Sequence, residues 1–511
     1  MPPVMLRRLL WLTSCFCAHA SPALRPQLFA GLGGMLNLPQ LDATVRLTAT
    51  ATVVALLDIW DLDANACLGQ QPVLRLLIEG LYTVAGDLQE MEGRMQALNA
   101  LAKLLRRAGP LLFSHAGSAL QPLPHMWILA EDQTPLRTCC LVIATHLMTA
   151  LASNEAVSKA MHPMVLPMVA ISTDPSQSSS LYLDGEGLAL WLALLRGCSG
   201  PESYTAELHS LFSHLPVLLQ HETDHLNTAM LIIEGYVVLG GNTFLSAYGS
   251  AVANLILGLI GAVKPKGFVY ICKPAEAILR KAPIEGAQLL EDVMRKALDL
   301  CCCEGQGKEP DMTVVLLISL LCRVLLTSPE KFSGLMAERA AAASLTTGEL
   351  LQRLVSEMTR LFDGAGYSAA GMWRRKLWVW SLLMLLGMGV APVIERMDEI
   401  VNMCVDILTE LKQDQEQQGA GSGSSQPPKH LLRLKQACRS TDEENGDEEA
   451  DLLSLALRKE LASDAAVTGD LKPIVTESMG AAARILGEER WSVVMSSVEP
   501  VLLTQLQELV T

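Results

Sequence analysis

The sequence has few aromatic residues and no pattern typical of β-hairpins. Phe, Trp and Tyr together make up 5% of the 511 residues, whereas half of all residues are hydrophobic. No Asn-Gly or Asp-Gly pair joins two segments of alternating apolar residues. Leu, Ala, Val and Met dominate instead. A sheet protein is therefore not expected, and the composition predicts an all-α fold.

The chain also lacks an excess of basic residues. It has 39 Lys and Arg against 54 Asp and Glu, which gives a net charge of -15. A surface that binds nucleic acid needs surplus positive charge, so nucleic acid is not an expected partner. An acidic surface suits a basic segment of a protein partner, although solubility alone also explains the charge.

Paired cysteine motifs are absent. None of the 13 cysteines forms a Cys-x-x-Cys pair, and most lie in apolar runs such as Cys139-Cys140 and Cys301-Cys302-Cys303. Helical neighbours cannot build the disulfide framework of a secreted domain. We therefore expect buried, reduced thiols in a cytosolic or nuclear protein, without a zinc ribbon or finger.

Most catalytic motifs are missing as well. The sequence contains no phosphate-binding loop and no Gly-x-Ser-x-Gly turn. His221-Glu222-Thr223-Asp224-His225 does match the His-Glu-x-x-His pattern of zinc peptidases, so a zinc peptidase is one alternative. However, Thr223 and Asp224 are typical of a turn, which would separate the two histidines. We assign no catalytic, cofactor-binding or metal-binding residue. We expect that the protein binds no cofactor and is not an enzyme.

Two uncharged runs, 235–263 and 377–394, are long enough to raise the question of a membrane span. Gly240-Gly241-Asn242-Thr243 interrupts the first run, and Gly387, Gly389 and Pro392 interrupt the second. Buried helices of a soluble protein therefore explain both runs better than membrane insertion does.

The stretch Ser180–Gly197 shows the pattern that organises the chain. Asp184-Gly185-Glu186-Gly187 forms a turn, an apolar run from Leu188 to Leu195 follows, and Gly197 ends it. Asp184 is expected to cap the helix. Because this helix is apolar nearly all round, it should be buried between neighbouring helices.

Similar helices recur along the chain at a regular distance. Asp42 and Asp132 each open a helix, and they lie two HEAT periods of about 40–47 residues apart. Asp42/Arg46 and Asp132/Arg137 are predicted to support neighbouring repeats. The fold class is therefore a HEAT/armadillo-like α-solenoid of antiparallel helix pairs, in which neighbouring pairs cover each other's apolar faces.

The sequence divides into three parts. Residues 1–412 are predicted to form the solenoid, 413–450 a disordered polar and acidic linker, and 451–511 the C-terminal capping helices, the last of them at 490–510. The acidic run 442–451 lies in the linker, where a solvated role is favoured over a ligand-binding one. Trp373, Trp378 and Trp380, with Arg374 and Arg375, fit core packing beside a basic helix edge better than a ligand patch.

Four segments, in order, resemble the importin-11-like branch of the karyopherin-β (importin-β) family. They span residues 4–510 and correspond to the C-terminal half of such receptors. They are Arg7–Leu12 with Leu24–Pro26, Asp184–Leu192, Arg375–Trp378 continuing to Ile400–Asn402, and Val498–Leu509.

The resemblance implies a nuclear import receptor that shuttles between cytoplasm and nucleus. Its partners would be protein cargo, nucleoporins and the GTPase Ran, with cargo released by Ran-GTP. The family's principal Ran site lies in N-terminal repeats that have no counterpart here, and no cargo or Ran residue can be carried over. A general HEAT-repeat scaffold without a transport role is the alternative.

The N-terminal residues 1–21 admit a second interpretation. Arg7-Arg8, the apolar run Leu9–Cys17 and Ala18-His19-Ala20 imitate a secretory signal peptide. The cysteine pattern and the lack of any Asn-x-Ser/Thr site argue against secretion. The resemblance makes these residues a repeat helix and places Met1 inside a longer receptor.

Overall fold

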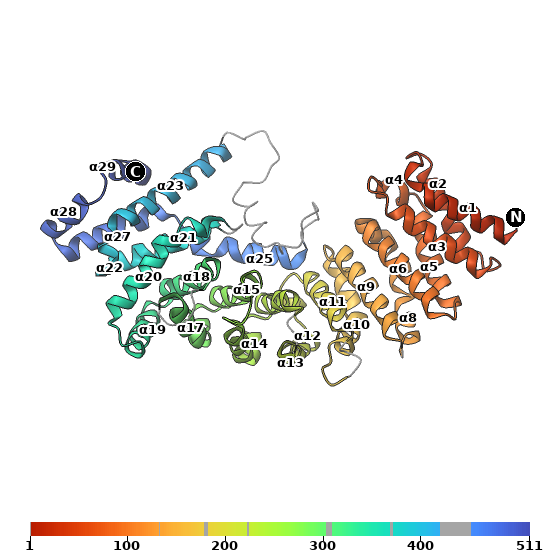
Figure 1. Cartoon of the computed structure of the whole chain (residues 1–511), viewed down its shortest axis with the longest axis horizontal. Coiled ribbons are helices and arrows are strands. Elements are labelled where there is room, and N and C mark those ends of the chain that lie inside the picture. The colour runs from red at the N-terminus through yellow and green to blue at the C-terminus, as the bar shows by residue number, and fades with distance from the viewer. Residues whose placement is uncertain are drawn as a thin grey trace. The chain divides into compact units, whose positions relative to one another are not determined.

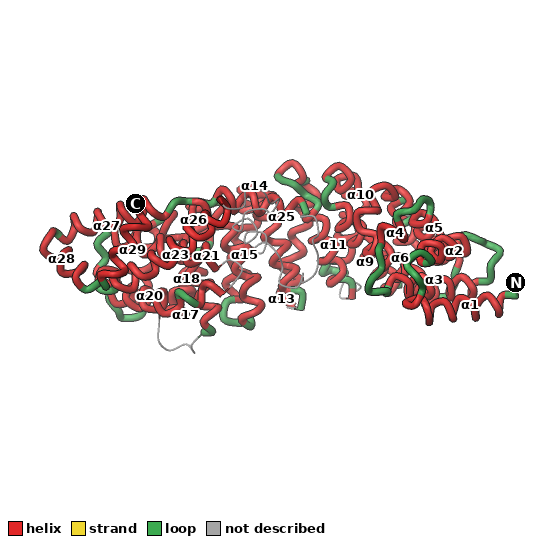
Figure 2. Tube along the Cα trace, turned by 90° about the horizontal axis from the view of Figure 1, so that it is seen from above, coloured by secondary structure: helices red, strands yellow, loops and turns green. Residues whose placement is uncertain are grey.

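The computed structural model describes residues 2–131, 133–177, 182–221, 224–302, 309–367, 371–419 and 451–511. The chain forms two compact units. Unit 1 comprises Met1–Ile232 with Glu449–Leu453, and unit 2 comprises Ile233–Glu448 with Ser454–Thr511. Within the described ranges, helices and loops account for both units and no strand occurs (Figure 2). The expectation of an all-α fold is confirmed.

The helices follow one another with short connections (Figure 1). Those of unit 1 are α1 Pro3–Phe16, α2 Arg25–Leu36, α3 Ala43–Leu57, α4 Ala64–Leu68, α5 Val73–Asp87, α6 Met91–Ala108, α7 Ala116–Leu120, α8 Leu123–Leu129, α9 Thr134–Leu151, α10 Glu155–Ser172, α11 Asp184–Arg196, α12 Ala206–Leu211 and α13 Leu215–His221. Next come α14 Leu226–Leu259, then α15 Pro265–Lys281, α16 Pro283–Leu289, α17 Glu291–Cys302, α18 Asp311–Thr327, α19 Pro329–Ala342, α20 Thr347–Leu361, α21 Gly371–Gly387, α22 Ala391–Ile394 and α23 Met397–Gly419. The C-terminal helices are α25 Leu452–Ser463, α26 Ala465–Thr468, α27 Leu471–Leu486, α28 Glu488–Ser496 and α29 Pro500–Val510.

Helices two or three apart in the chain pack side by side, which is the arrangement of a solenoid. In unit 1, α1, α3, α6, α9 and α11 form one such series, and α2 packs against α5. In unit 2, α15 packs against α18, and α18 packs against α21. Each helix pair thereby gains cover for the apolar face that it could not bury alone.

Polar contacts between neighbouring repeats have the sequence separation of a HEAT period. Asn37 Nδ2 donates to the Leu76 carbonyl 39 residues away, at 2.7 Å. Arg339 binds Asp299 over 40 residues, and Arg396 donates to Ser356 Oγ, also over 40 residues. The repeat length expected from the sequence is therefore the spacing of contacts in the structure.

Asp42 and Arg46, predicted to support neighbouring repeats, each bind a different partner. Asp42 caps α3 by accepting a hydrogen bond from the Thr44 backbone at 2.8 Å. Arg46 reaches the next repeat, where it binds Asp87 at 2.7 Å. Arg137 lies over the Trp127 ring at 4.8 Å, and Asp132 lies outside the described residues.

Helix α11, the organising stretch of the sequence, is buried as expected. Trp191 has no exposed surface, and Leu190, Leu194 and Leu195 are equally covered. The predicted cap is wrong by one position: Leu183 is the N-cap, and Asp184 is the first helical residue. Asp184 still stabilises the helix start, because its carboxylate accepts a hydrogen bond from the Gly185 backbone at 2.9 Å.

The described N-terminal residues belong to this packing. Helix α1 lies against α3, Leu10 is buried, and Thr52 Oγ1 donates to the Leu10 carbonyl at 3.1 Å. All of the described cysteines except Cys15 are buried, as predicted. Burial raises the pKa of the Cys140 thiol to about 12, which keeps it protonated and unreactive at neutral pH.

Two of the described helices, α9 and α14, are long and apolar enough to cross a membrane by length and composition. Buried core helices pass the same test, and α14 bends at Gly241, where φ is 48° and ψ is -132°. The interruption predicted at Gly240–Thr243 is thus present as a kink. In the second uncharged run, α21 ends at Gly387 and the separate helix α22 begins at Ala391, so the predicted interruption is present there too.

The C-terminal part departs from the sequence prediction at two places. The single helix predicted over 490–510 is wrong, because α28 ends at Ser496 and α29 begins at Pro500, which lacks the N–H that a continuous helix would use. Helix α23 extends past Lys412 to Gly419, into the range predicted as linker. Residues 420–450 lie outside the described residues, and the three-part division stays a prediction.

Replacing Gly241 with Ala tests the kink in α14. An L-residue is strained at this φ and ψ, so we expect the free energy of unfolding to fall by about 1–2 kcal/mol. Gly258→Ala, at an exposed position where an added Cβ meets no atom within 4 Å, is the matched control. It should raise stability by about 0.5–1 kcal/mol. Denaturant titration measures both, and equal effects of the two substitutions would show that α14 is straight at this point.

Candidate interaction surface of unit 2

Buried cations gather where three successive helices of unit 2 lie side by side. Arg280 comes from α15, Arg323 from α18, and Arg374 and Lys376 from α21. Each of these side chains is less than a tenth exposed. We call these four residues the basic row. Buried cations are costly unless carboxylates or hydrogen-bond acceptors face them, so the contacts of the basic row define this surface.

A segment from the C-terminal part of the chain lies across the basic row. We call residues 454–469, which include most of α25 and all of α26, the crossing segment (Figure 1). Glu460 Oε1 lies 3.4 Å from Arg280 Nε on α15. Asp464 Oδ2 lies 2.8 Å from Arg323 Nη2 on α18. The Val467 carbonyl accepts a hydrogen bond from Lys376 Nζ on α21 at 2.8 Å.

The contacts advance along both partners at once. Positions 460, 464 and 467 of the crossing segment meet α15, α18 and α21 in that order. Leu457 and Leu461 are buried one helical turn apart, so the segment also contributes an apolar side. One polar contact to each successive helix, beside an apolar stripe, is the way an extended partner binds across a repeat array.

Two further carboxylates face the basic row from the helices themselves. Glu276 lies between two of the cations, 3.8 Å from Arg280 and 3.4 Å from Arg374. Glu234, on α14, is buried, and desolvation raises its pKa, while Lys273 and Arg280 oppose that rise. Desolvation lowers the pKa of Lys376, and Asp470 and Asp464 oppose that effect.

Several polar atoms at this surface are buried without a hydrogen-bond partner. They are Arg323 Nε and Nη2, Arg374 Nε, Trp373 Nε1, Glu460 Oε2 and Asp464 Oδ2. Arg458 Nε, on the crossing segment itself, is buried in the same way. The Arg323–Asp464 contact is therefore ionic but poorly oriented for a hydrogen bond. The guanidinium groups of Arg323 and Arg374 lie 5.3 and 5.5 Å from the Trp373 ring. The crossing segment neutralises the basic row without satisfying its donors.

The tryptophan cluster predicted to be core is divided. Trp378 is fully buried and donates from Nε1 to Ser319 Oγ at 3.1 Å, as core packing requires. Trp373 lies beside the basic row instead. Gly469 approaches Trp380 so closely that an added Cβ would lie 3.0 Å from the ring. Core packing therefore describes Trp378, whereas Trp373 and Trp380 contribute to the surface that the crossing segment covers.

The histidine pair of the zinc-peptidase alternative is not placed on one helix. His221 is the last residue of α13, and α14 begins after His225, at Leu226. The His225 ring lies against α11, where a Cβ on Gly185 would come within 2.8 Å of it. Glu222 and Thr223 lie outside the described residues. Among the residues that the structure describes, no group of three or more His, Cys, Asp and Glu side chains could hold a metal ion.

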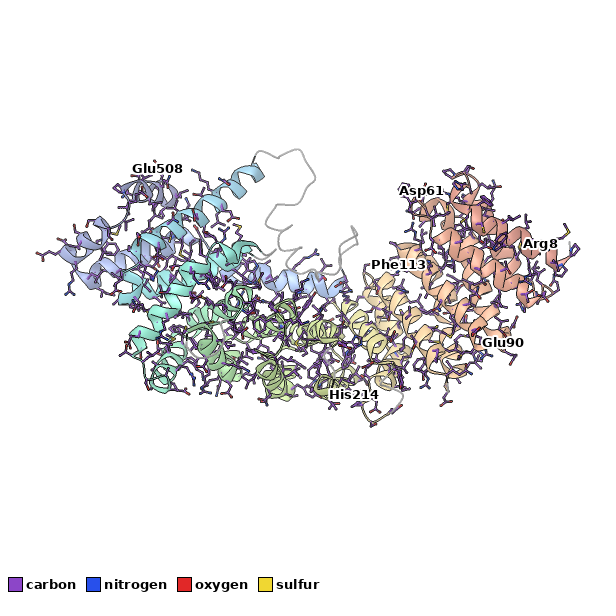
Figure 3. The ribbon with its side chains drawn as sticks, in the orientation of Figure 1. Arg8, Asp61, Glu90, Phe113, His214 and Glu508 are labelled. Atoms are coloured by element: carbon purple, nitrogen blue, oxygen red, sulfur yellow. The ribbon has the colours of Figure 1, made fainter. Side chains whose placement is uncertain are left out.

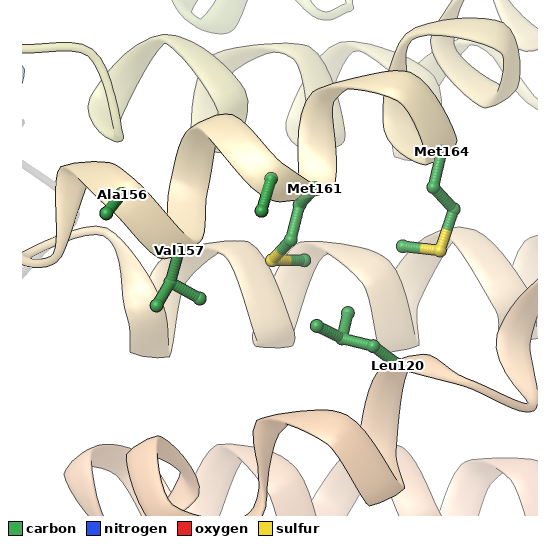
Figure 4. A pocket seen from close by; sticks show the side chains of 6 residues that line it. Leu120, Ala156, Val157, Met161 and Met164 are labelled. Atoms are coloured by element: carbon green, nitrogen blue, oxygen red, sulfur yellow. The ribbon is translucent and has the colours of Figure 1, made fainter.

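Unit 1 carries a separate apolar pocket between α7 and α10. Its volume is about 310 Å³ (Figure 4). The residues that line it are Leu120, Ala156, Val157, Ala160, Met161 and Met164. An apolar side chain fits such a pocket, whereas a charged one would lose its hydration there. All of the lining side chains are apolar, so the pocket is suited to binding an apolar group.

Exposed aromatic side chains also occur on unit 1. Trp60, in the loop after α3, is 91% exposed, and Phe113 is 38% exposed. Figure 3 labels Phe113 and also Asp61, the neighbour of Trp60, which forms an ion pair with Arg25 at 3.2 Å. Single exposed rings are common on protein surfaces and do not by themselves mark a site.

Comparison with known proteins agrees with this architecture. A family model described as "Importin-11-like, TPR repeats" matches residues 139–511. Importin-11 of Mus musculus and of Homo sapiens are 25% and 26% identical over 506 residues, 98% of this chain and 49% of theirs. The chain thus spans about half the length of the curated relatives it matches.

A solved structure shows the same fold. The structure titled as Lph2, a bidirectional nuclear transport receptor in S. cerevisiae, superposes with a TM-score of 0.76 at 17% identity, over 99% of this chain and 52% of that chain. The architecture is therefore a helical-repeat solenoid of the karyopherin type. More narrowly, because the family model covers most of the chain, the chain belongs to the importin-11-like family. The relatives are named as importins rather than enzymes, which agrees with the expectation that this chain is not an enzyme.

Sequence reasoning identified only part of the basic row. Arg374 and Lys376 stand out in the run Arg374-Arg375-Lys376, but Arg280 and Arg323 were not singled out. Arg323 had a usable signal, because it is the one cation within the Leu- and Val-rich helix α18. A lone cation in an otherwise apolar buried helix requires a counter-charge from another part of the chain. The sequence does not show that Asp464 supplies it.

Asp464→Asn tests whether the crossing segment is held by charge. Asn keeps the capping group of α26 but leaves Arg323 buried without a counter-ion, so we expect a loss of about 3 kcal/mol. Asp63→Asn, at the exposed cap of α4, should change stability by less than about 0.5 kcal/mol. Chemical denaturation compares the two, and an equally small effect of both would contradict a charge-based attachment.

Glu234→Gln tests the buried carboxyl on α14. The folded-state pKa of Glu234 lies above its usual value, so ionisation costs stability as pH rises through and above about 4.5. The Gln variant avoids this cost. Its melting temperature relative to wild type should therefore be higher at pH 8 than at pH 4. Glu285→Gln, at an exposed position, serves as control. A pH-independent difference for Glu234→Gln would refute the assignment.

Proposed function

We propose that the chain is the cargo-binding part of a nuclear import receptor of the importin-β family. It binds protein cargo, passes through the nuclear pore by contacts with nucleoporins, and shuttles between cytoplasm and nucleus. The observation that carries this proposal is the family match over residues 139–511 on a repeat fold whose relatives are importins. The fold suits the role, because stacked helix pairs present an extended surface to protein partners.

The physical properties of the chain support particular parts of this proposal. The net charge of -15 favours cargo that offers a basic segment. The pocket between α7 and α10 suits an apolar side chain, and we propose it as a nucleoporin contact. Release of cargo by Ran-GTP is proposed from the family resemblance, which places the principal Ran site in the N-terminal repeats of such receptors.

A permeabilised-cell assay tests entry through the pore. The chain is fused to a fluorescent reporter too large to diffuse through the pore, and nuclear fluorescence is followed with time. We expect the fusion to accumulate at the nuclear rim and inside the nucleus. Exclusion of a folded fusion from both places would contradict the receptor role and favour a scaffold that has no transport function.

Ala160→Glu tests the pocket in the same assay. A carboxylate at this position would be desolvated by any apolar partner side chain, so nuclear entry should fall about tenfold. Ala337→Glu, on the exposed surface of α19, is the matched control and should not change entry. If both variants enter at the wild-type rate, the nucleoporin contact lies elsewhere.

Ran dependence separates the receptor from the general scaffold. Cargo captured on the immobilised chain is challenged with Ran loaded with a non-hydrolysable GTP analogue, and with Ran-GDP as control. Displacement by the GTP form alone is the expected result for a receptor. Displacement by neither form, from a chain that also fails to enter nuclei, would favour the scaffold.

A further inference from the structure

The crossing segment makes a poorly completed contact with a strongly charged surface. Glu460 and Asp464 are the acidic side chains that it places against the basic row. Glu460 Oε2 has no hydrogen-bond partner, and Asp464 Oδ2 meets Arg323 Nη2 as an ion pair at 2.8 Å without the geometry of a hydrogen bond. On the opposite side, Arg323 and Arg374, both nine-tenths or more buried on their side chains, leave N–H donors unpaired. Buried donors and acceptors left in this way destabilise the contact relative to fully hydrogen-bonded ones. A ligand with better-placed carboxylates would bind the same surface more favourably.

The charges of this surface determine whether the ligand must be acidic or basic. With the crossing segment removed, the four cations of the basic row would face three carboxylates, Glu234, Glu276 and Asp470. Lys281, 3.7 Å from Glu460, adds a further cation at one end. The surface would then carry surplus positive charge on a chain whose net charge is -15. The partner fitted to this surface is therefore acidic, although the rest of the chain suits a basic one.

The crossing segment also shows the shape of the ligand. Most of it is the helix α25, on which Leu457 and Leu461 are buried and Glu460 faces the basic row. Asp464 lies in the extended break between α25 and α26. The helix also carries the basic pair Arg458-Lys459. A ligand of this shape is a short amphipathic helix with one acidic residue on its polar side and a second one just beyond its C-terminal end.

We propose that the basic row is a binding site for an acidic amphipathic helix of a partner protein, and that the crossing segment occupies this site in cis. The inference does not depend on a transport role, since it rests on the contacts within unit 2. A tethered segment competes at an effective concentration near the millimolar range, so a partner helix must bind the site better than the segment does. Because the segment is incompletely hydrogen-bonded, a partner helix with better-placed carboxylates is able to displace it.

Binding of a peptide in trans tests the proposal. A fluorescein-labelled peptide of residues 451–469 is titrated with the whole chain, and fluorescence anisotropy reports binding. In the variant E460R/D464R the segment is repelled by the basic row. This variant should bind the peptide at least tenfold more tightly than the wild-type chain, and the affinity should fall as salt is raised.

A charge exchange supplies the matched control. Adding R280E/R323E to E460R/D464R restores opposite charges between the crossing segment and the row. This quadruple variant should reject the wild-type peptide and bind a peptide that carries the E460R/D464R changes once its own segment is displaced. A wild-type peptide that binds the double and quadruple variants equally would overturn the proposal, because its site would then lie elsewhere.

Circular dichroism and thermal melting establish that each variant is folded. If E460R/D464R does not melt cooperatively, E460Q/D464N takes its place, because it removes the charges without reversing them. That variant should bind the peptide at least threefold more tightly than wild type. Affinity no greater than that of the wild-type chain, in a folded variant, would show that the segment is a structural brace rather than the occupant of a binding site.

Discussion

Burial of helix faces between neighbouring repeats is the constraint on which the rest of the structure depends. Helices such as α11 and α18 are apolar on nearly every side, so no single partner helix can cover them. They are stable because a preceding and a following helix pack against them. The same requirement sets the spacing of about 40 residues at which polar side chains join one repeat to the next.

Charges inside such a packing are tolerated only with counter-charges, and this second constraint places the crossing segment. Arg280 and Arg323 lie on helices whose neighbours along the solenoid supply too few carboxylates. The missing charges come from the C-terminal part of the chain. Glu460, which pairs with Arg280, lies 180 residues further along, and Asp464 pairs with Arg323. A long-range ionic contact thereby joins the C-terminal helices to the middle of unit 2.

The sequence predicted the helices and their repeat well, because both follow from local patterns. Asp42 and Asp132 marked the starts of α3 and α9 to within a few residues, and Gly241 marked the bend in α14. It failed where distant residues decide the outcome. Asp42 and Arg46 look like a pair, yet Arg46 binds Asp87 in the next repeat. The partner of Arg323 is equally invisible to local patterns, so the candidate interaction surface emerged only with the structure.

The central claim is that unit 2 holds a binding site for an acidic helix and that the chain fills this site itself. Hydrogen–deuterium exchange of the wild-type chain, with and without a saturating excess of the acidic peptide, tests it most directly. The account predicts that amides of residues 454–469 exchange faster when the peptide is bound, while those of α18 stay protected. Unchanged protection of 454–469 at saturation would contradict the account.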